Sequence, residues 1–183
     1  MPDQPSSGQL PGKTVAASAS VLATLMEPAA ANPMGNIHGG HIMKLTDQAG
    51  AAAAIRHAGR ICVTASIDRL DFVNPVHVGD MVVLKSAVNY THRTSMEVGV
   101  RIEAERLETG ERKHVATAYL IFVALDAAGR PTPVPPVVPE TESERLRYRQ
   151  ADLRYRSRQA QRLQERALSE PDDGLGSKGG VVG

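Results

Sequence analysis

One acidic residue, Asp47, stands inside a strongly apolar stretch, and two glycines precede it by seven and eight positions. Gly39 and Gly40 lack a Cβ, so a ligand can approach their backbone closely. If a helix begins near His41, the unpaired N–H groups of its first turn point toward that ligand. Because residues seven apart share a helical face, Asp47 can act on a carbonyl whose oxygen those N–H groups stabilise.

These residues belong to a loop followed by one long helix. The loop is rich in Asn, Pro and Gly, and the helix is expected to end at Gly59. The helix is apolar almost all round, which predicts that it is buried. A buried carboxylate is costly without a partner, so Asp47 needs an explanation. Asn32, in the loop, offers an amide that can hold a water or a carbonyl.

The composition fits one domain of 183 residues with a single core. A formal net charge of +1 and few aromatic residues, with no Trp, argue against a nucleic-acid partner. Cys62 is the single cysteine, so an intramolecular disulfide is impossible and a reducing compartment fits. The N-terminus lacks the pattern of a secretory signal, and no apolar run would span a bilayer. We therefore expect a soluble, cytoplasmic protein with no membrane partner.

Strand patterns surround the expected helix. One candidate strand precedes it and four follow it, joined by short turns: residues 14–26, 61–73, 81–90, 96–107 and 113–125. Short turns make neighbouring strands antiparallel. The alternation in 96–107 predicts one buried face and one solvated face. One antiparallel sheet against one helix is an α+β arrangement, and the uncovered part of the helix and the sheet edges suggest a dimer.

The chain divides into four parts. Residues 1–12 and 169–183 are expected to be disordered, and 13–130 to form the domain. Residues 131–168 comprise a Pro-rich extended connector, to residue 139, and a charged helix. That helix has a thin apolar seam at seven-residue spacing, formed by Leu146, Leu153, Ala160 and Ala167. It is either a solvated surface helix or an arm that supplies arginines to a ligand phosphate or a neighbouring subunit.

The loop and helix together form one long motif. It reads Asn32-x-x-Gly35-Asn36-x-His38-Gly39-Gly40-x-Ile42-Met43-x-x-x-Asp47. Further matching segments are Val63–Ala65, Asp71–Val76, Val78–Asp80, Arg93–Val98 and Phe122–Asp126. This pattern resembles the hotdog-fold acyl-CoA thioesterases, in particular the cytosolic acyl-CoA hydrolases and the YciA-like enzymes, over roughly residues 14 to 158.

The resemblance implies a hotdog fold, in which a curved antiparallel sheet wraps one long helix. Two subunits would pair into a continuous sheet, and three such dimers would form a hexamer. The substrate would be an acyl-CoA thioester of fatty-acid and lipid metabolism, hydrolysed to the free acid and CoA. No metal or other cofactor is implied, because coenzyme A is part of the substrate.

The resemblance also implies roles for individual residues. Asp47 would be the general base or nucleophile, Asn32 would come from the opposite subunit, and the Gly39 and Gly40 amides would be oxyanion donors. The Arg93–Ser95 segment matches the loop that meets the CoA phosphates. The candidate substrate and CoA contacts are His38, Thr64, Arg93, Thr94 and Ser95.

Several alternatives stay open. Asp47 could be a structural acid, paired with Lys44 or Arg56 or bonded to a nearby backbone group, and Asn32 could only shape a turn. Thr64 could serve packing alone. Asp47 could deprotonate a water or attack the thioester directly, and the sequence does not choose between them. The rival functions are a hotdog hydratase or dehydratase acting on acyl thioesters and a non-catalytic acyl-CoA-binding module.

Overall fold

One antiparallel five-stranded sheet, in the order β2-β4-β5-β6-β3, forms the centre of the computed structural model, which describes residues 10–169. The elements in chain order are β1 (Lys13–Thr14), α1 (Val15–Ser18), β2 (Ser20–Leu25), the 3-10 turn η1 (Pro28–Ala30), α2 (Gly39–Ala58), β3 (Cys62–Phe72), β4 (Asp80–Thr91), β5 (Ser95–Arg106), β6 (Glu111–Ala124), β7 (Val137–Val138) and α3 (Glu142–Ser169). The α+β class predicted from the sequence is confirmed. Within this part of the chain, no helix combines the length and hydrophobicity needed to cross a membrane. The disorder predicted for residues 1–12 and 169–183 falls mostly outside the described part; of the residues inside it, 10–12 form no helix or strand and Ser169 is the last residue of α3.

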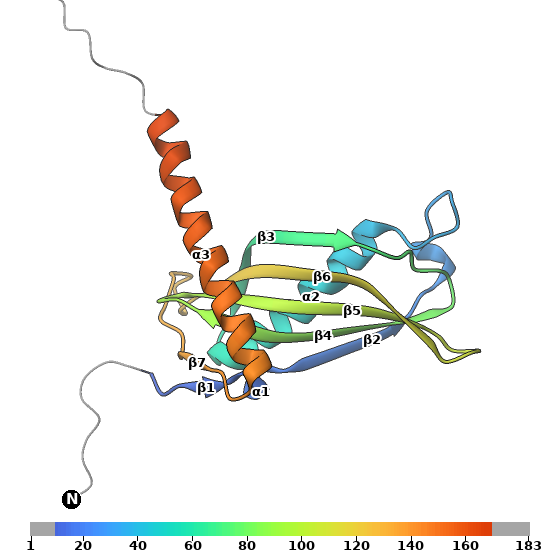
Figure 1. The fold of residues 1–183 in the computed structure, drawn as a ribbon, viewed down its shortest axis with the longest axis horizontal. Coiled ribbons are helices and arrows are strands. Elements are labelled where there is room, and N and C mark those ends of the chain that lie inside the picture. Colours follow the sequence, from blue (N-terminus) through green and yellow to red (C-terminus); the bar gives the residue numbers. More distant parts are fainter. Residues whose placement is uncertain (1–9, 170–183) are drawn as a thin grey trace, which may run out of the picture.

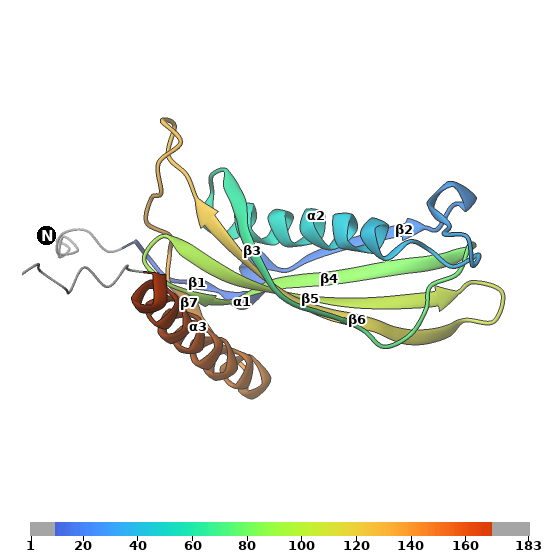
Figure 2. The ribbon, with the colours of Figure 1, turned by 90° about the horizontal axis from the view of Figure 1, so that it is seen from above.

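Helix α2 lies along one face of the curved sheet, and α3 lies on the other (Figures 1 and 2). Helix α2 begins at Gly39, two residues earlier than expected, and ends at Gly59, whose φ of 68° is the left-handed conformation that glycine favours. Its sheet-facing side is rich in alanine, and a Cβ on Gly50 would lie 3.0 Å from the Phe122 ring, so the helix packs very closely on the sheet.

The expectation that α2 is buried all round is wrong for a single protomer. Met43 and Ile55 are 41% and 43% exposed, on the side turned away from the sheet. The edge strand β3 also leaves apolar side chains in solvent, among them Val63 and Ile67. The sheet is too narrow to enclose the helix, so this helix side and strand edge are surfaces that a partner can cover.

The predicted strand over residues 14–26 is interrupted. The Thr14 hydroxyl accepts a hydrogen bond from the amide of Ala17 and starts the one-turn helix α1. The turn buries Ser18, whose hydroxyl accepts a bond from the amide of Val88. Small residues without alternation allow this turn, and β2 covers only the second half of the predicted strand. The four later strands are confirmed, with ends that differ by a residue or two.

The solvated outer face predicted for residues 96–107 is partly wrong, because α3 covers it near Glu97. That carboxylate is 1% exposed and lies beneath the guanidinium of Arg154. The apolar seam of α3 does not face the sheet, since Leu146 and Leu153 are 49% and 65% exposed. Helix α3 packs instead through a different side that includes the fully buried Ala151, and its later turns project beyond the sheet (Figure 1).

The Pro-rich connector between β6 and α3 is extended, as predicted, and it is held by β1 and by the last turn of α2. Strand β7 pairs in parallel with β1. The buried ring of His57, in the last turn of α2, has its Nε2 2.9 Å from the carbonyl oxygen of Pro135. Burial lowers the pKa of His57, so the neutral ring donates this hydrogen bond.

Candidate active site at the start of the central helix

Asp47 is half-buried on α2 and reaches across to the edge strand β3. The hydroxyl of Thr64 donates a short hydrogen bond of 2.5 Å to its Oδ1. A charge-assisted bond of this kind fixes the carboxylate and leaves its second oxygen for other partners. Among residues 10–169, Asp47 makes no ion pair: Lys44 is exposed, and the guanidinium of Arg56 donates to the carbonyl of Ala19. The structural-acid alternative therefore lacks its cation.

The first turn of α2 presents unused backbone donors. The carbonyl of His38 accepts from the amides of His41 and Ile42, at 2.9 and 3.3 Å. The amides of Gly39 and Gly40 have no acceptor in the described part of the chain, and the exposed His38 side chain does not cap the helix. Two unpaired N–H groups at the positive end of a helix attract an oxygen that carries negative charge.

The chain itself does not require glycine at these two positions. A Cβ on Gly39 would lie 3.8 Å from the Phe72 ring, an ordinary contact, and a Cβ on Gly40 would have no neighbour closer than His38 at 4.0 Å. Neither residue has a positive φ. The space above their amides is therefore open to a molecule from outside the protomer.

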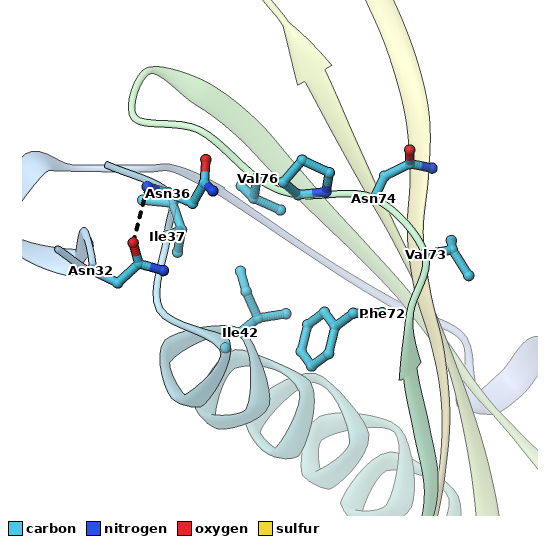
Figure 3. A pocket seen from close by; sticks show the side chains of 10 residues that line it. Asn32, Asn36, Ile37, Ile42, Phe72, Val73, Asn74 and Val76 are labelled. Carbon is cyan, nitrogen blue, oxygen red and sulfur yellow. Dashed lines mark hydrogen bonds between the residues drawn. The ribbon is translucent and has the colours of Figure 1, made fainter. Parts of the chain in front are cut away.

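Asn32 has a structural role and one free group. Its Oδ1 accepts hydrogen bonds from the amides of Met34 and Asn36, at 2.9 and 3.2 Å, which fold the loop before α2. The Oδ1 atom of Asn32 therefore does shape the turn, as the alternative interpretation proposed. Within residues 10–169 the side-chain NH2 is not engaged, and it points toward the hollow in front of α2 (Figure 3). Holding the oxygen orients the NH2 group as a donor.

This hollow has a volume of about 370 Å³ and joins the loop, the start of α2 and the end of β3 (Figure 3). Its walls are apolar at Ile42 and Phe72 and polar at Asn32 and Asn74. Phe72 was not among the predicted site residues, although its segment was part of the motif. An exposed aromatic ring at a strand end, 47% accessible, is the signal that could have indicated it.

One protomer does not bring all the predicted residues together. Asp47 does not line the hollow and lies about 10 Å along the helix from Gly40. The Arg93–Ser95 loop is at the other end of the sheet: on β6, Phe72 pairs with Ala116 and Ser95 with Val123, about 23 Å apart. Within a single chain the predicted site residues therefore lie in separate groups. In the described part, no group of three or more His, Cys, Asp or Glu could hold a metal ion.

Comparisons with known sequences place this chain among thioester-cleaving proteins. Residues 34–111 match the model of the thioesterase superfamily. An uncharacterized acyl-CoA thioester hydrolase of Bacillus subtilis is 42% identical over 142 residues, which cover 78% of this chain and 83% of the relative. The cytosolic acyl coenzyme A thioester hydrolase of Rattus norvegicus is 34% identical over 151 residues, 81% of this chain. The match spans only 40% of that mammalian protein.

Solved structures agree over most of the fold. An acyl-CoA hydrolase from Staphylococcus aureus, in complex with butyryl coenzyme A and coenzyme A, has a TM-score of 0.80 and 34% identity over 86% of this chain and 96% of that one. A hexameric acyl-CoA thioesterase has a TM-score of 0.80 and 38% identity. The match covers 88% of this chain and 100% of that one. The S. aureus hydrolase has also been solved with an Asp, an Asn or a Thr replaced by Ala.

Proposed function

We propose that this chain, which belongs to the thioesterase superfamily, is an enzyme that hydrolyses acyl-CoA thioesters to a carboxylic acid and free CoA. The B. subtilis relative and the S. aureus structure support this reading, since the match covers most of both proteins. The observation that carries the proposal is a carboxylate held by a hydroxyl, with no cation partner in the described part of the chain, on the helix whose start presents two free amides.

The proposed site is completed by a second copy of the chain. Asn32, Gly39 and Gly40 would come from one protomer and the Asp47–Thr64 pair from the other. The separation of these groups within one chain and the exposed side of α2 support this arrangement. The residues replaced in the S. aureus hydrolase support the choice of groups. Its Asn and Asp are 15 residues apart and its Asp and Thr are 17 apart, the spacings of Asn32, Asp47 and Thr64 here.

In this mechanism the thioester carbonyl oxygen accepts hydrogen bonds from the amides of Gly39 and Gly40. Negative charge that develops on the oxygen is stabilised by these donors and by the helix dipole. Asp47 takes a proton from a water, the water oxygen attacks the carbonyl carbon, and the C–S bond breaks. The CoA thiolate then takes the proton from Asp47. In the other version Asp47 attacks directly, and water hydrolyses the resulting anhydride.

The remaining groups have supporting roles in this proposal. The NH2 of Asn32 would hold the water or the carbonyl, and Thr64 would orient Asp47 so that its Oδ2 faces the substrate. His38, beside the helix start, would contact the acyl-CoA, and Arg93, Thr94 and Ser95 would meet the CoA phosphates. Hexameric relatives support a trimer of dimers, and the name of the rat relative supports a cytoplasmic location.

Thiol release from a panel of acyl-CoAs tests the proposed reaction. We expect release by the wild-type protein and a loss of at least about 100-fold in kcat for Asp47→Ala. Lys44→Ala, an exposed change one turn earlier on the same helix, is the control and should retain activity. A change in enoyl-CoA absorbance without thiol release would instead indicate a hydratase, and CoA binding without any turnover would indicate a binding module.

Mixed oligomers test the shared site. Asn32→Ala and Asp47→Ala, each inactive alone, would regain part of the wild-type activity when co-expressed, because some dimers would contain one intact site. Absence of recovery in oligomers shown to contain both chains would refute a site built from two protomers.

A further inference from the structure

Strand β3 carries the hydroxyl that holds Asp47, yet it is the least buried of the four long strands. It lies at the edge of the sheet and pairs only with β6 in the described part of the chain. Of its eleven residues, only Cys62 is buried. Segments with few buried side chains open and shift more easily than the core. The position of β3 therefore depends on contacts other than those of the core.

Two β-bulges interrupt the pairing of β3 with β6. In each bulge one residue of β3 has no partner on β6: Ala65 in the first and Asp68 in the second. The first bulge directly follows Thr64. A bulge bends its strand and changes the direction of neighbouring side chains. The direction of the Thr64 hydroxyl therefore depends on how this bulged segment is held.

Helix α3, on the face opposite α2 (Figure 2), holds the second bulge. The guanidinium of Arg158 donates a bond of 2.6 Å to Oδ2 of Asp68, and the two side chains are 16% and 22% exposed. The same guanidinium lies 3.5 Å from the carboxylate of Glu97 on β5. Since β6 lies between β5 and β3, Arg158 joins the edge strand to the interior of the sheet across β6.

The inner end of this connection is itself fixed. The guanidinium of Arg154 donates bonds of 2.6 and 3.1 Å to the buried carboxylate of Glu97 and lies over the ring of Tyr119. Arg158 follows Arg154 by four residues, so both arginines share one side of α3. The planar guanidinium of arginine can contact two carboxylates at once, which a lysine ammonium does less well. The sheet therefore holds α3 through Arg154, and α3 holds β3 through Arg158.

We infer that Arg158 and Asp68 are positioning residues for the proposed reaction. Their contact fixes the bulged part of β3 from the outer face and so directs the hydroxyl of Thr64 toward Asp47 on the inner face. Asp68 is four residues, about 13 Å along the strand, from Thr64. The two hydrogen bonds, of 2.6 and 2.5 Å, leave the same strand on opposite faces of the sheet. This inference rests on the proposed function, and it gives the charged helix α3 a role in catalysis without contact with the substrate.

Asp68→Ala, measured with and without Thr64→Val, tests this link. In the wild-type background kcat for acyl-CoA should fall about threefold, less than the roughly tenfold loss expected for Thr64→Val, with KM unchanged. In the Thr64→Val background Asp68→Ala should cause no further loss, because the hydroxyl through which it acts is absent. A general loss of stability would instead lower activity in both backgrounds. An equal loss in both, or no loss in either, would overturn the inference.

Arg158→Ala removes the other partner of the contact. It should lower kcat as much as Asp68→Ala does, and the two changes together should cost no more than either alone. Arg156→Ala is the matched control, because this exposed arginine of α3 forms its ion pair with Asp152 on the same helix. It should keep the wild-type kcat. Light scattering should give one oligomer mass for all variants, and a lower mass for Asp68→Ala would assign its loss to assembly and contradict the inference.

Hydrogen exchange tests the contact between α3 and β3 without turnover. The amides of β3 beside Thr64 should exchange several times faster in Asp68→Ala than in the wild type, and at the wild-type rate in Arg156→Ala. Unchanged exchange in β3 would refute the inference even if the enzyme is active. If the wild type releases no thiol but β3 exchanges faster in Asp68→Ala, the proposed function fails and the support of β3 by α3 remains.

Discussion

The two long helices lie on opposite faces of one sheet and are held there in different ways. Helix α2 contacts the sheet through alanine, glycine and aliphatic side chains along its whole length. Helix α3 contacts it through tyrosines and arginines as far as Arg158, which bonds to Asp68, and the guanidinium of Arg154 lies 3.8 Å from the ring centroid of Tyr119. The inner contact depends on shape and hydrophobicity, and the outer one on a few directional contacts.

This difference has consequences for stability and for function. Removing one contact from α2 changes the core that every strand shares, so its effect spreads through the domain. Removing one contact from α3 should free the helix while the sheet and α2 remain folded. The chemistry proposed for the inner face needs rigid groups, and the shared core beneath α2 supplies that rigidity.

The largest effect is expected for Glu97→Ala. The change leaves the guanidinium of Arg154 partly buried and unpaired, which costs about 3 kcal/mol. Hydrogen exchange should lose protection in α3 and keep it in α2. Glu105→Ala, which breaks a surface pair with Arg112, is the control and should cost less than about 1 kcal/mol. Loss of α2 protection in Glu97→Ala would show that the two contacts are not separable.

On the inner face, Thr64→Val removes the hydroxyl that holds Asp47 and conserves the side-chain volume. Losing a hydrogen bond to a charged group should lower kcat for acyl-CoA about tenfold, with little change in Tm. Thr117→Val makes the same change on β6, where the hydroxyl lies 3.2 Å from Nε2 of His114. Kinetics that cannot distinguish the two variants would leave Thr64 with a packing role only.

Two glycines of α2 provide a third test. Gly50→Ala places a methyl group 3.0 Å from the Phe122 ring, so overpacking should outweigh the gain in helix propensity by about 1 kcal/mol. Gly40→Ala meets nothing closer than 4.0 Å, so its thermal stability should be unchanged. Its turnover of acyl-CoA should fall, because the methyl group occupies the approach to the free amides. Thermal unfolding and thiol release would give opposite rankings for the two variants.

The smallest effect concerns pH. Burial lowers the pKa of His57, so below the ordinary value of 6.5 the unfolded chain takes up a proton that the folded chain does not. The free energy of unfolding should therefore fall by less than about 1 kcal/mol between pH 7 and pH 6, and continue to fall until the lowered pKa is passed. His57→Gln keeps a donor for Pro135 and should lose this pH dependence. Urea unfolding across this pH range would measure the effect. If the free energy of unfolding changed with pH equally in the wild type and in His57→Gln, His57 would be excluded as the cause.

The sequence was sufficient for the inner half of the molecule because its signals are local. Gly59 ends α2 in the left-handed conformation, and Gly110 occupies, with positive φ, the turn predicted between residues 107 and 113. Alternating apolar residues gave the strands of the sheet. The Asn-to-Asp motif indicated residues that the fold does place at the start of α2 and on its exposed side.

The outer half could not be predicted because its contacts join residues distant in the chain. Glu97 and Arg154 are 57 positions apart, and an acid in an alternating strand normally faces solvent. The regular spacing of Leu146 and Leu153 predicted an apolar seam, but the helix contacts the sheet through tyrosines, whose larger rings bury more surface. The proposed shared site is also beyond a single chain, because its parts would meet only if two protomers associated.

Strand β3 ends the sheet with eleven residues whose outer edge has no neighbouring strand in the described part of the chain. Such an edge pairs readily with another strand. A second copy of the same chain is the expected partner, because most soluble oligomers are formed by identical chains. We therefore expect the thermal stability of the folded protein to increase with protein concentration. Dilution should lower the melting temperature, and concentrated protein should resist unfolding at temperatures where a dilute sample does not.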